Sequence, residues 1–254
     1  MKAIFITVRT GSSRLPKKAL LEINGLPTIT RVIRRVAQSQ KKDIVVLCTT
    51  VEEEDTILAQ IAQQEGINFF RGSTLDKLDR WNKAAKQYNV EFFVTADGDD
   101  LFCEPELIDL AFSQYEKNKP DFIEGVGLAC GSFSYAIKAS ALAKVCEIKD
   151  TDQTEMMWTY FKDTGQFNCE TLQGVNPIFQ RPDIRITLDY PDDFTFFKTV
   201  IEHFEKNGND SYYSLRDIIN YLNSHPEVVK VNQHCQNLFL TNQKKKTFLK
   251  LKKT

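Results

Sequence analysis

The sequence contains little of what zinc sites, nucleic-acid binding and membrane spans require. Its 254 residues include six cysteines and three histidines, and no two cysteines stand in the Cys-x-x-Cys spacing of a zinc site. The net charge is only −1, so no overall positive field attracts nucleic acid. No apolar run approaches the roughly 20 residues of a membrane-spanning helix. We therefore expect a protein without nucleic-acid partners or membrane spans, and its scattered cysteines favour reduced thiols in the cytoplasm.

Short apolar runs alternate with segments of helical periodicity along most of the chain. Hydrophobic residues make up 42% of the sequence and charged residues 26%, as in ordinary globular proteins. The apolar runs lack interior charges, which is typical of strands buried on both faces of a parallel sheet. They span residues 4–8, 44–49, 67–70 and 92–96. The alternation predicts an α/β fold with a doubly wound, mostly parallel sheet in three layers.

A short loop rich in cations follows the first predicted strand. Over residues 9–18 it carries Arg9, Arg14, Lys17 and Lys18. Ligands of open α/β sheets bind at the carboxyl ends of the strands, and Gly11 lets the backbone come close to a ligand. Clustered cations repel one another unless an anion lies between them, and a polyphosphate matches both guanidinium and ammonium donors. A solvated basic turn is the alternative interpretation.

Carboxylates gather at the end of the strand predicted over residues 92–96. The next four residues read Asp97-Gly98-Asp99-Asp100, and neighbouring carboxylates repel one another unless a cation neutralises them. Mg²⁺ suits such a position, because it accepts one or two carboxylates and completes its shell with water and phosphate. Asp97 and Asp99 also form the Asp-x-Asp pattern that metal-dependent glycosyltransferases use. A turn with solvated acids is a third interpretation.

The cationic loop resembles a known signature. Its pattern Arg-x-Gly-Ser-x-Arg-Leu-Pro-x-Lys, residues 9–18, is similar to the nucleotide-binding loop of the sugar-acid cytidylyltransferases. These include the CMP-Kdo and CMP-sialic acid synthetases, and the resemblance is closest to their spore-coat polysaccharide biosynthesis branch. It implies one Rossmann-like nucleotidyltransferase domain over residues 1–254. It also implies a homodimeric enzyme that transfers CMP from CTP to a sugar acid or related acceptor and releases pyrophosphate, in surface-polysaccharide precursor synthesis.

The resemblance also implies roles for individual residues. Asp99 takes the place of the relatives' metal-binding Asp, which makes Mg²⁺ the expected cofactor. Residues 185–194 resemble their second motif, a strand that ends in a metal-binding Asp before a helix, here Asp189; a helix cap is the alternative. An Arg-Gly-Ser loop lies near the base in the relatives. We therefore expect catalytic roles for Arg9, Lys18, Asp99 and Asp189, nucleotide binding by Arg9, Thr10, Gly11, Ser12, Arg14, Lys18, Arg71, Ser73 and Asp97, and metal binding by Asp99 and Asp189.

Two positions depart from the relatives' pattern, and two segments have coarser assignments. Leu101 stands near where a proline is usual, and Met156 replaces a histidine. Two other functions therefore remain open, namely a metal-dependent nucleotide-sugar glycosyltransferase and a non-catalytic nucleotide-binding subunit. Residues 125–180 correspond to the acceptor and dimerisation insertion of the relatives. The lysine-rich residues 240–254 are expected to form a solvated, frayed tail, with contact to a membrane surface or an acidic partner as the alternative.

Overall fold

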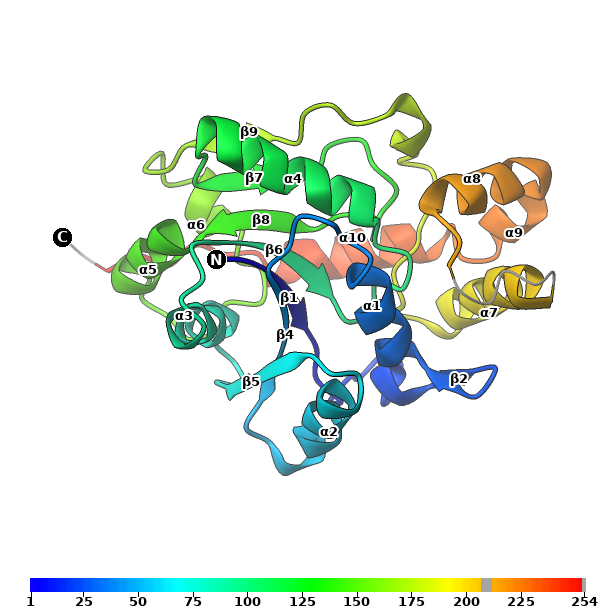
Figure 1. Cartoon of the computed structure of the whole chain (residues 1–254), viewed down its shortest axis with the longest axis horizontal. Helices are drawn as coiled ribbons and strands as arrows, with labels where there is room; N and C mark the ends of the chain where they lie inside the picture. The colour runs from blue at the N-terminus through cyan, green and yellow to red at the C-terminus, as the bar shows by residue number, and fades with distance from the viewer. Residues whose placement is uncertain (207–211, 253–254) are drawn as a thin grey trace.

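A seven-stranded sheet forms the middle of the molecule. The computed structural model describes residues 1–206 and 212–252, and its sheet has the strand order β5-β4-β1-β6-β8-β7-β9 (Figure 1). The strands are β1 (Lys2–Thr7), β4 (Ile44–Thr50), β5 (Asn68–Gly72), β6 (Phe92–Asp97), β7 (Phe122–Glu124), β8 (Tyr135–Lys138) and β9 (Cys169–Thr171). The first four in sheet order run parallel, and β8 is antiparallel to both of its neighbours. The predicted mostly parallel sheet is confirmed.

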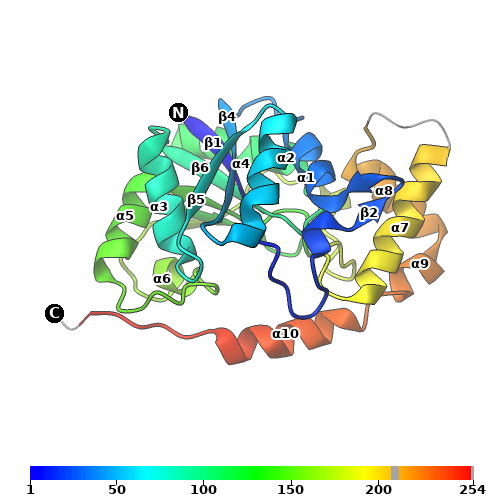
Figure 2. The ribbon, with the colours of Figure 1, turned by 90° about the horizontal axis from the view of Figure 1, so that it is seen from below.

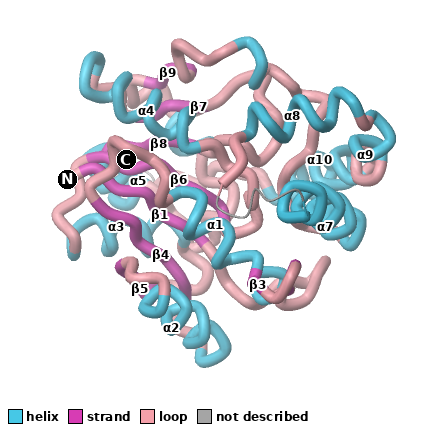
Figure 3. The backbone as a smooth tube through the Cα atoms, turned by 45° about the vertical axis from the view of Figure 1, so that its right-hand side comes forward, coloured by secondary structure: helices cyan, strands magenta, loops and turns pink. Residues whose placement is uncertain are grey.

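Helices cover both faces of this sheet, each over its own apolar core. One core is shared by α1 (Thr28–Val36), α2 (Thr56–Gln64), α4 (Pro105–Asn118), α7 (Pro191–Lys206) and α8 (Leu215–Ser224). The other core is shared by α3 (Lys77–Gln87), α5 (Ala139–Ile148) and α6 (Thr159–Lys162). Figure 3 shows the strands as a central layer between these helices. The three-layer architecture predicted from the sequence is therefore confirmed.

The remaining elements are short, except for the last helix. A two-stranded hairpin of β2 (Glu22–Ile23) and β3 (Leu26–Pro27) precedes α1. Single turns of 3₁₀ helix occupy Lys18–Leu20, Glu53–Asp55 and Pro177–Phe179. The chain ends with α9 (Pro226–Lys230) and α10 (Cys235–Lys246). None of the described helices combines the length and apolarity that crossing a membrane would take.

Register brings the two motif-bearing loops together at one edge of the sheet. Strand β1 lies between β4 and β6, with Thr7 opposite Asp97, so the segments that follow these two residues leave the sheet side by side. Gly98 makes the approach close: its N–H donates to the Thr7 carbonyl at 2.8 Å. A Cβ at Gly98 would lie 2.6 Å from the Cβ of Val8. Only glycine fits there without displacing the first strand.

The strand expected to end in Asp189 is absent, and that expectation is wrong. The segment forms a single β-bridge, from Arg185 to Cys130, and continues in extended form. It crosses the end of the sheet, where the Leu188 N–H donates to the Asp99 carbonyl at 2.9 Å. A β-ladder needs a neighbouring strand as its hydrogen-bonding partner. This segment passes a loop instead, so no ladder forms. The crossing nevertheless places Asp189 beside Asp99.

The basic tail is ordered over its described part, so the expectation of a frayed end is also wrong. Residues 235–246 form α10, which runs along one side of the molecule past the loop after β1 (Figure 2). Beyond it the Asp150 N–H donates to the Lys250 carbonyl at 2.9 Å, and the Lys252 N–H donates to the Ile148 carbonyl at 2.8 Å. These backbone bonds hold the tail against the end of α5. Within the predicted insertion of residues 125–180, β8 is part of the central sheet, and the acceptor and dimerisation role stays a prediction.

Candidate active site

A large cavity opens where β1 and β6 end. Its volume is about 920 Å³, which is at the upper end of the size range for small-molecule sites. The loop after β1, the loop after β6, the segment before α7 and part of α10 contribute to its walls. Eight of the residues predicted from the sequence line it: Arg9, Gly11, Ser12, Arg14, Lys18, Asp97, Asp99 and Asp189.

One lysine joins the two carboxylates that were predicted to meet. The Lys18 ammonium contacts Asp99 Oδ2, and it lies 2.9 Å from Asp189 Oδ1. Its position comes from the 3₁₀ turn that Lys18 begins, where the Thr28 hydroxyl donates to the Lys18 carbonyl at 2.6 Å. The Lys18 side chain is only 15% exposed. The two carboxylates therefore lie together as predicted, and the Lys18 ammonium bridges them.

Asp189 has a richer set of cations than Asp99. Besides Lys18 it contacts the Arg14 guanidinium, and Arg185 donates to its other oxygen at 3.1 Å. Burial alone would raise the pKa of Asp189, but Lys18 and Arg14 together hold that pKa well below its usual range. For Asp99, burial and the nearby Asp189 outweigh Lys18, so its pKa is raised. Burial would lower the pKa of Lys18, and the two carboxylates raise it. Lys18 therefore stays charged at neutral pH.

A buried ion pair behind Asp189 fixes its position. Arg185 forms two hydrogen bonds with Asp193, at 2.9 and 3.1 Å, and both side chains are almost completely buried. Asp193 also accepts from the backbone N–H groups of Asp189 and Tyr190, at 2.9 and 3.0 Å. These N–H groups begin α7, where a carboxylate is stabilised by the helix dipole. Sequence reasoning missed Arg185, although its spacing of four residues before Asp189 was visible.

The loop after β1 is held by a residue that sequence reasoning also missed. Asp55 Oδ1 accepts from both the N–H and the hydroxyl of Thr10, each at 2.7 Å, and its other oxygen accepts from Thr50. Burial alone would raise the pKa of Asp55, but these hydrogen bonds lower it below its usual value. Thr10 is buried at this contact and does not line the cavity. Its predicted nucleotide contact stays a prediction, and its evident role is to position the loop.

Comparisons with known proteins identify the fold's relatives. A sequence profile described as "Cytidylyltransferase" matches residues 3–245. The chain belongs to the cytidylyltransferase family. An uncharacterized protein of Methanocaldococcus jannaschii is 30% identical over 92% of this chain and 96% of its own length. The spore coat polysaccharide biosynthesis protein SpsF of Bacillus subtilis is 25% identical, covering 87% and 94%. The structure of a cytidylyltransferase from Leptospira borgpetersenii superposes with a TM-score of 0.80 at 25% identity, covering 90% and 96%.

Family membership settles one alternative that the sequence left open. A cytidylyltransferase is a nucleotidyltransferase, so the chain is not a nucleotide-sugar glycosyltransferase despite its Asp97-Gly98-Asp99 run. The cationic loop lines the same cavity as these carboxylates. A cavity that combines cations with carboxylates at the ends of parallel strands suits the phosphates of a nucleoside triphosphate.

Arg71 and Ser73 do not line the cavity of this cytidylyltransferase. The Arg71 guanidinium donates to the carbonyls of Thr50 and Glu52, at 3.0 and 2.7 Å. The Ser73 hydroxyl accepts from the Asp76 N–H at 3.1 Å, just before α3 begins. Both residues shape the β5–α3 connection, and their predicted base contacts stay predictions.

A different arginine from the same region faces the cavity. Arg80, in the first turns of α3, lines it although the residue is only 4% exposed. One guanidinium nitrogen donates to the Ser73 carbonyl at 2.6 Å, while its buried Nε has no hydrogen-bond partner among the described residues. Burial, together with the positive charge of Arg9, lowers the pKa of Arg80. A buried, incompletely paired guanidinium is suited to a ligand acceptor.

Proposed function

We propose that this cytidylyltransferase transfers CMP from CTP to an oxygen of a sugar acid or related acceptor and releases pyrophosphate, in surface-polysaccharide precursor synthesis. The observation that carries the proposal is the Lys18 ammonium between Asp99 and Asp189, at the end of a cationic loop in a cavity of about 920 Å³. The pattern of that loop and the similarity to SpsF support the nucleotide and the polysaccharide context. All six cysteines are free thiols, which agrees with the cytoplasmic location that we include in the proposal.

The residues that line the cavity have different proposed roles in nucleotidyl transfer. Phosphoryl chemistry needs little covalent help; it needs charge neutralisation and alignment of the reactants. Arg9 is exposed at the cavity and makes no hydrogen bond or ion pair with a described residue, so it is free to bind phosphate. Lys18 lies where we place the α-phosphate. The backbone at Gly11 and Ser12 can come close to the bound nucleotide. The acceptor oxygen would then attack the α-phosphorus as pyrophosphate leaves.

The carboxylates fit a bound Mg²⁺ ion. Oxygens of Asp99 and Asp189 already share one cation, the Lys18 ammonium, so a single charge can bridge them. Carboxylate oxygens are the ligands that Mg²⁺ prefers, and two of them leave positions for water and phosphate. Mg²⁺ held by Asp99 and Asp189 would polarise the α-phosphate and neutralise charge on the leaving pyrophosphate. Lys18 would then be released to bind phosphate.

CTP is expected to bind more tightly than UTP, ATP or GTP. The expectation comes from the family and from the loop of residues 9–18, with Arg80 as a buried donor beside the cavity. Calorimetric titration of the four triphosphates with Mg²⁺ measures the preference. A pyrophosphate-release assay with a panel of sugar acids then identifies the acceptor. Equal affinities for the four triphosphates, or a preference for another base, would contradict the assignment as a CTP-dependent enzyme. Release of pyrophosphate would exclude a non-catalytic nucleotide-binding subunit.

The protein is proposed to act as a homodimer. The resemblance implies this state, and large apolar side chains are exposed on α10 and the segment after it, including Leu238, Leu240 and Leu251. A second copy of the chain packed along α10 and the segment after it would cover part of this exposed apolar surface. Multi-angle light scattering is expected to give twice the monomer mass, and the double variant Leu238→Glu/Leu240→Glu should shift the mass toward one chain. A wild-type mass of 29.2 kDa at all concentrations would rule out the dimer.

A further inference from the structure

Helix α10 forms a wall of the active-site cavity. Phe239, Gln243, Lys245 and Lys246 line the cavity from this helix, opposite the loop after β1. Figure 2 shows the helix lying along the tip of that loop, although more than 200 residues separate them in the sequence. The aromatic ring of Tyr190 connects the two sides: Arg14 lies 5.5 Å from its centroid, and Asn242 donates to its hydroxyl at 3.3 Å. The lysine-rich segment is therefore part of the site.

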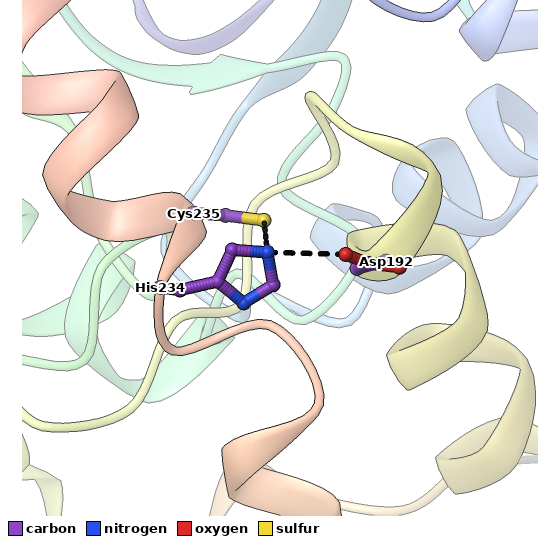
Figure 4. A group of neighbouring side chains, drawn as sticks. All are labelled: Asp192, His234 and Cys235. Carbon is purple, nitrogen blue, oxygen red and sulfur yellow. Dashed lines mark hydrogen bonds and ion pairs between the residues drawn. The ribbon is translucent and has the colours of Figure 1, made fainter.

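The first turn of α10 is anchored firmly. The Asn232 amide donates to Asp193 at 2.9 Å and to the Arg185 carbonyl at 3.1 Å, and Asn232 is buried. Beside it, His234 Nε2 lies 3.1 Å from Asp192 Oδ2 and 3.5 Å from the sulfur of buried Cys235 (Figure 4). The side chains of His234 and Asp192 are more than half exposed, so the contacts of the buried Asn232 provide most of this anchor. The anchor joins α10 directly to the ion pair that positions Asp189.

The other end of α10 lies over the cavity. There Lys246 forms an ion pair with Glu155 at 3.1 Å, and both side chains are about half exposed. Ion pairs of such exposure contribute little to stability, because water screens them. The segment that follows is held by the backbone hydrogen bonds of Lys250 and Lys252 to the end of α5. The lysine-rich end of α10 is therefore kept beside the cavity from both directions.

Lys245 is an uncompensated cation at this lysine-rich end of α10. It lines the cavity and makes no hydrogen bond or ion pair with any residue in the described part of the chain. Arg9, on the opposite side, also lacks such partners. Burial would raise the pKa of Glu155, but Lys246, Arg9 and Lys77 lower it, so these three cations act on one carboxylate that also lines the cavity. Positive charge from two walls favours a polyanion between them.

We propose that Lys245 binds the phosphate chain of the nucleotide from the side opposite the loop of residues 9–18. The inference rests on the proposed nucleotidyl transfer and adds α10 to the reactant-binding residues. Lys245 and Arg9 together supply the positive charge that the outer phosphates need, while Lys18 serves the phosphate next to Asp99 and Asp189.

The test compares Lys245→Gln with a matched control. Lys244→Gln removes the neighbouring charge on the same helix, and Lys244 is exposed and lies outside the cavity wall. Calorimetry measures binding of CTP, CMP and inorganic tripolyphosphate to each protein. Lys245→Gln is expected to weaken CTP and tripolyphosphate binding about tenfold and to leave CMP binding unchanged. Lys244→Gln should resemble the wild type for all three probes, and both variants should keep the wild-type melting temperature.

The outcomes separate this inference from the proposed function. Tripolyphosphate carries no base. Weaker tripolyphosphate binding by Lys245→Gln therefore supports the contact between Lys245 and phosphate, whichever nucleotide the enzyme uses. Wild-type protein that binds tripolyphosphate but does not prefer CTP would contradict the cytidylyl assignment alone. Equal affinity of Lys245→Gln and wild type for both CTP and tripolyphosphate would overturn the inference. An equal loss in Lys244→Gln would also overturn it, because general attraction by the helix would then explain the effect.

Discussion

Replacing Asp189 with asparagine is expected to lower turnover at least roughly a hundredfold and to destabilise the fold. The activity loss follows because Asp189 is one of two proposed Mg²⁺ ligands. The stability loss follows because the buried carboxylate balances Arg14, Lys18 and Arg185. We expect a cost of roughly 3 kcal/mol, the lower end of the range for breaking a buried ion pair, since Arg185 keeps Asp193. Urea unfolding and a pyrophosphate-release assay measure the two effects.

Asp99→Asn is the matched control, because the same chemical change meets different surroundings. The Asp99 side chain is 21% exposed and has one cation, Lys18, which keeps its contact with Asp189. Loss of the Asp99 carboxylate should cost about 1 kcal/mol of stability or less. The fraction of turnover that is lost should be similar to the fraction lost in Asp189→Asn. Since both carboxylates are proposed to bind one Mg²⁺ ion, the double variant should lose little more turnover than either single one. Near wild-type turnover in either variant, or equal destabilisation by both, would contradict the arrangement.

Lys18→Gln is expected to weaken CTP binding by roughly 10- to 150-fold, the equivalent of about 1.5–3 kcal/mol for a hydrogen bond to a charged group. The effect on folding should be smaller. Asp189 keeps two arginines when the ammonium is lost, and only Asp99 is left without a cation. Glutamine retains the length of the side chain and one donor. Calorimetry with CTP and urea unfolding of the ligand-free protein distinguish the two effects.

The neighbouring lysine provides the control for this variant. Lys17 is exposed and lies outside the cavity wall, so Lys17→Gln removes the same charge from the same loop without touching Asp99 or Asp189. Its CTP affinity should stay within about twofold of the wild type, since exposed charges are screened by salt. Should both variants lose affinity equally, Lys18 would act only through the general charge of the loop, and its specific role would be refuted.

The sequence alone was sufficient for the local features of this protein. The apolar runs predicted β1, β4, β5 and β6 within two residues at each end, because strands buried on both faces leave a continuous hydrophobic signal. The cationic loop and the carboxylates after β6 could be assigned to one cavity, because the ends of parallel strands share an edge of the sheet. The spacing of residues 9–18 was also sufficient to indicate the family, which the profile match over residues 3–245 then showed.

The tertiary structure decided which residues meet across the chain. Lys18 lies 81 residues from Asp99 and 171 from Asp189, and no local pattern predicts that one ammonium bridges them. The sequence predicted that Arg71 binds the nucleotide, yet hydrogen bonds to backbone carbonyls hold Arg71 outside the cavity. The buried Arg80 lines the cavity instead. The lysine-rich end reads as a solvated tail because its charges outnumber its apolar residues locally. Its contacts with Glu155, Tyr160 and the end of α5 arise from packing, and packing depends on residues that are distant in sequence.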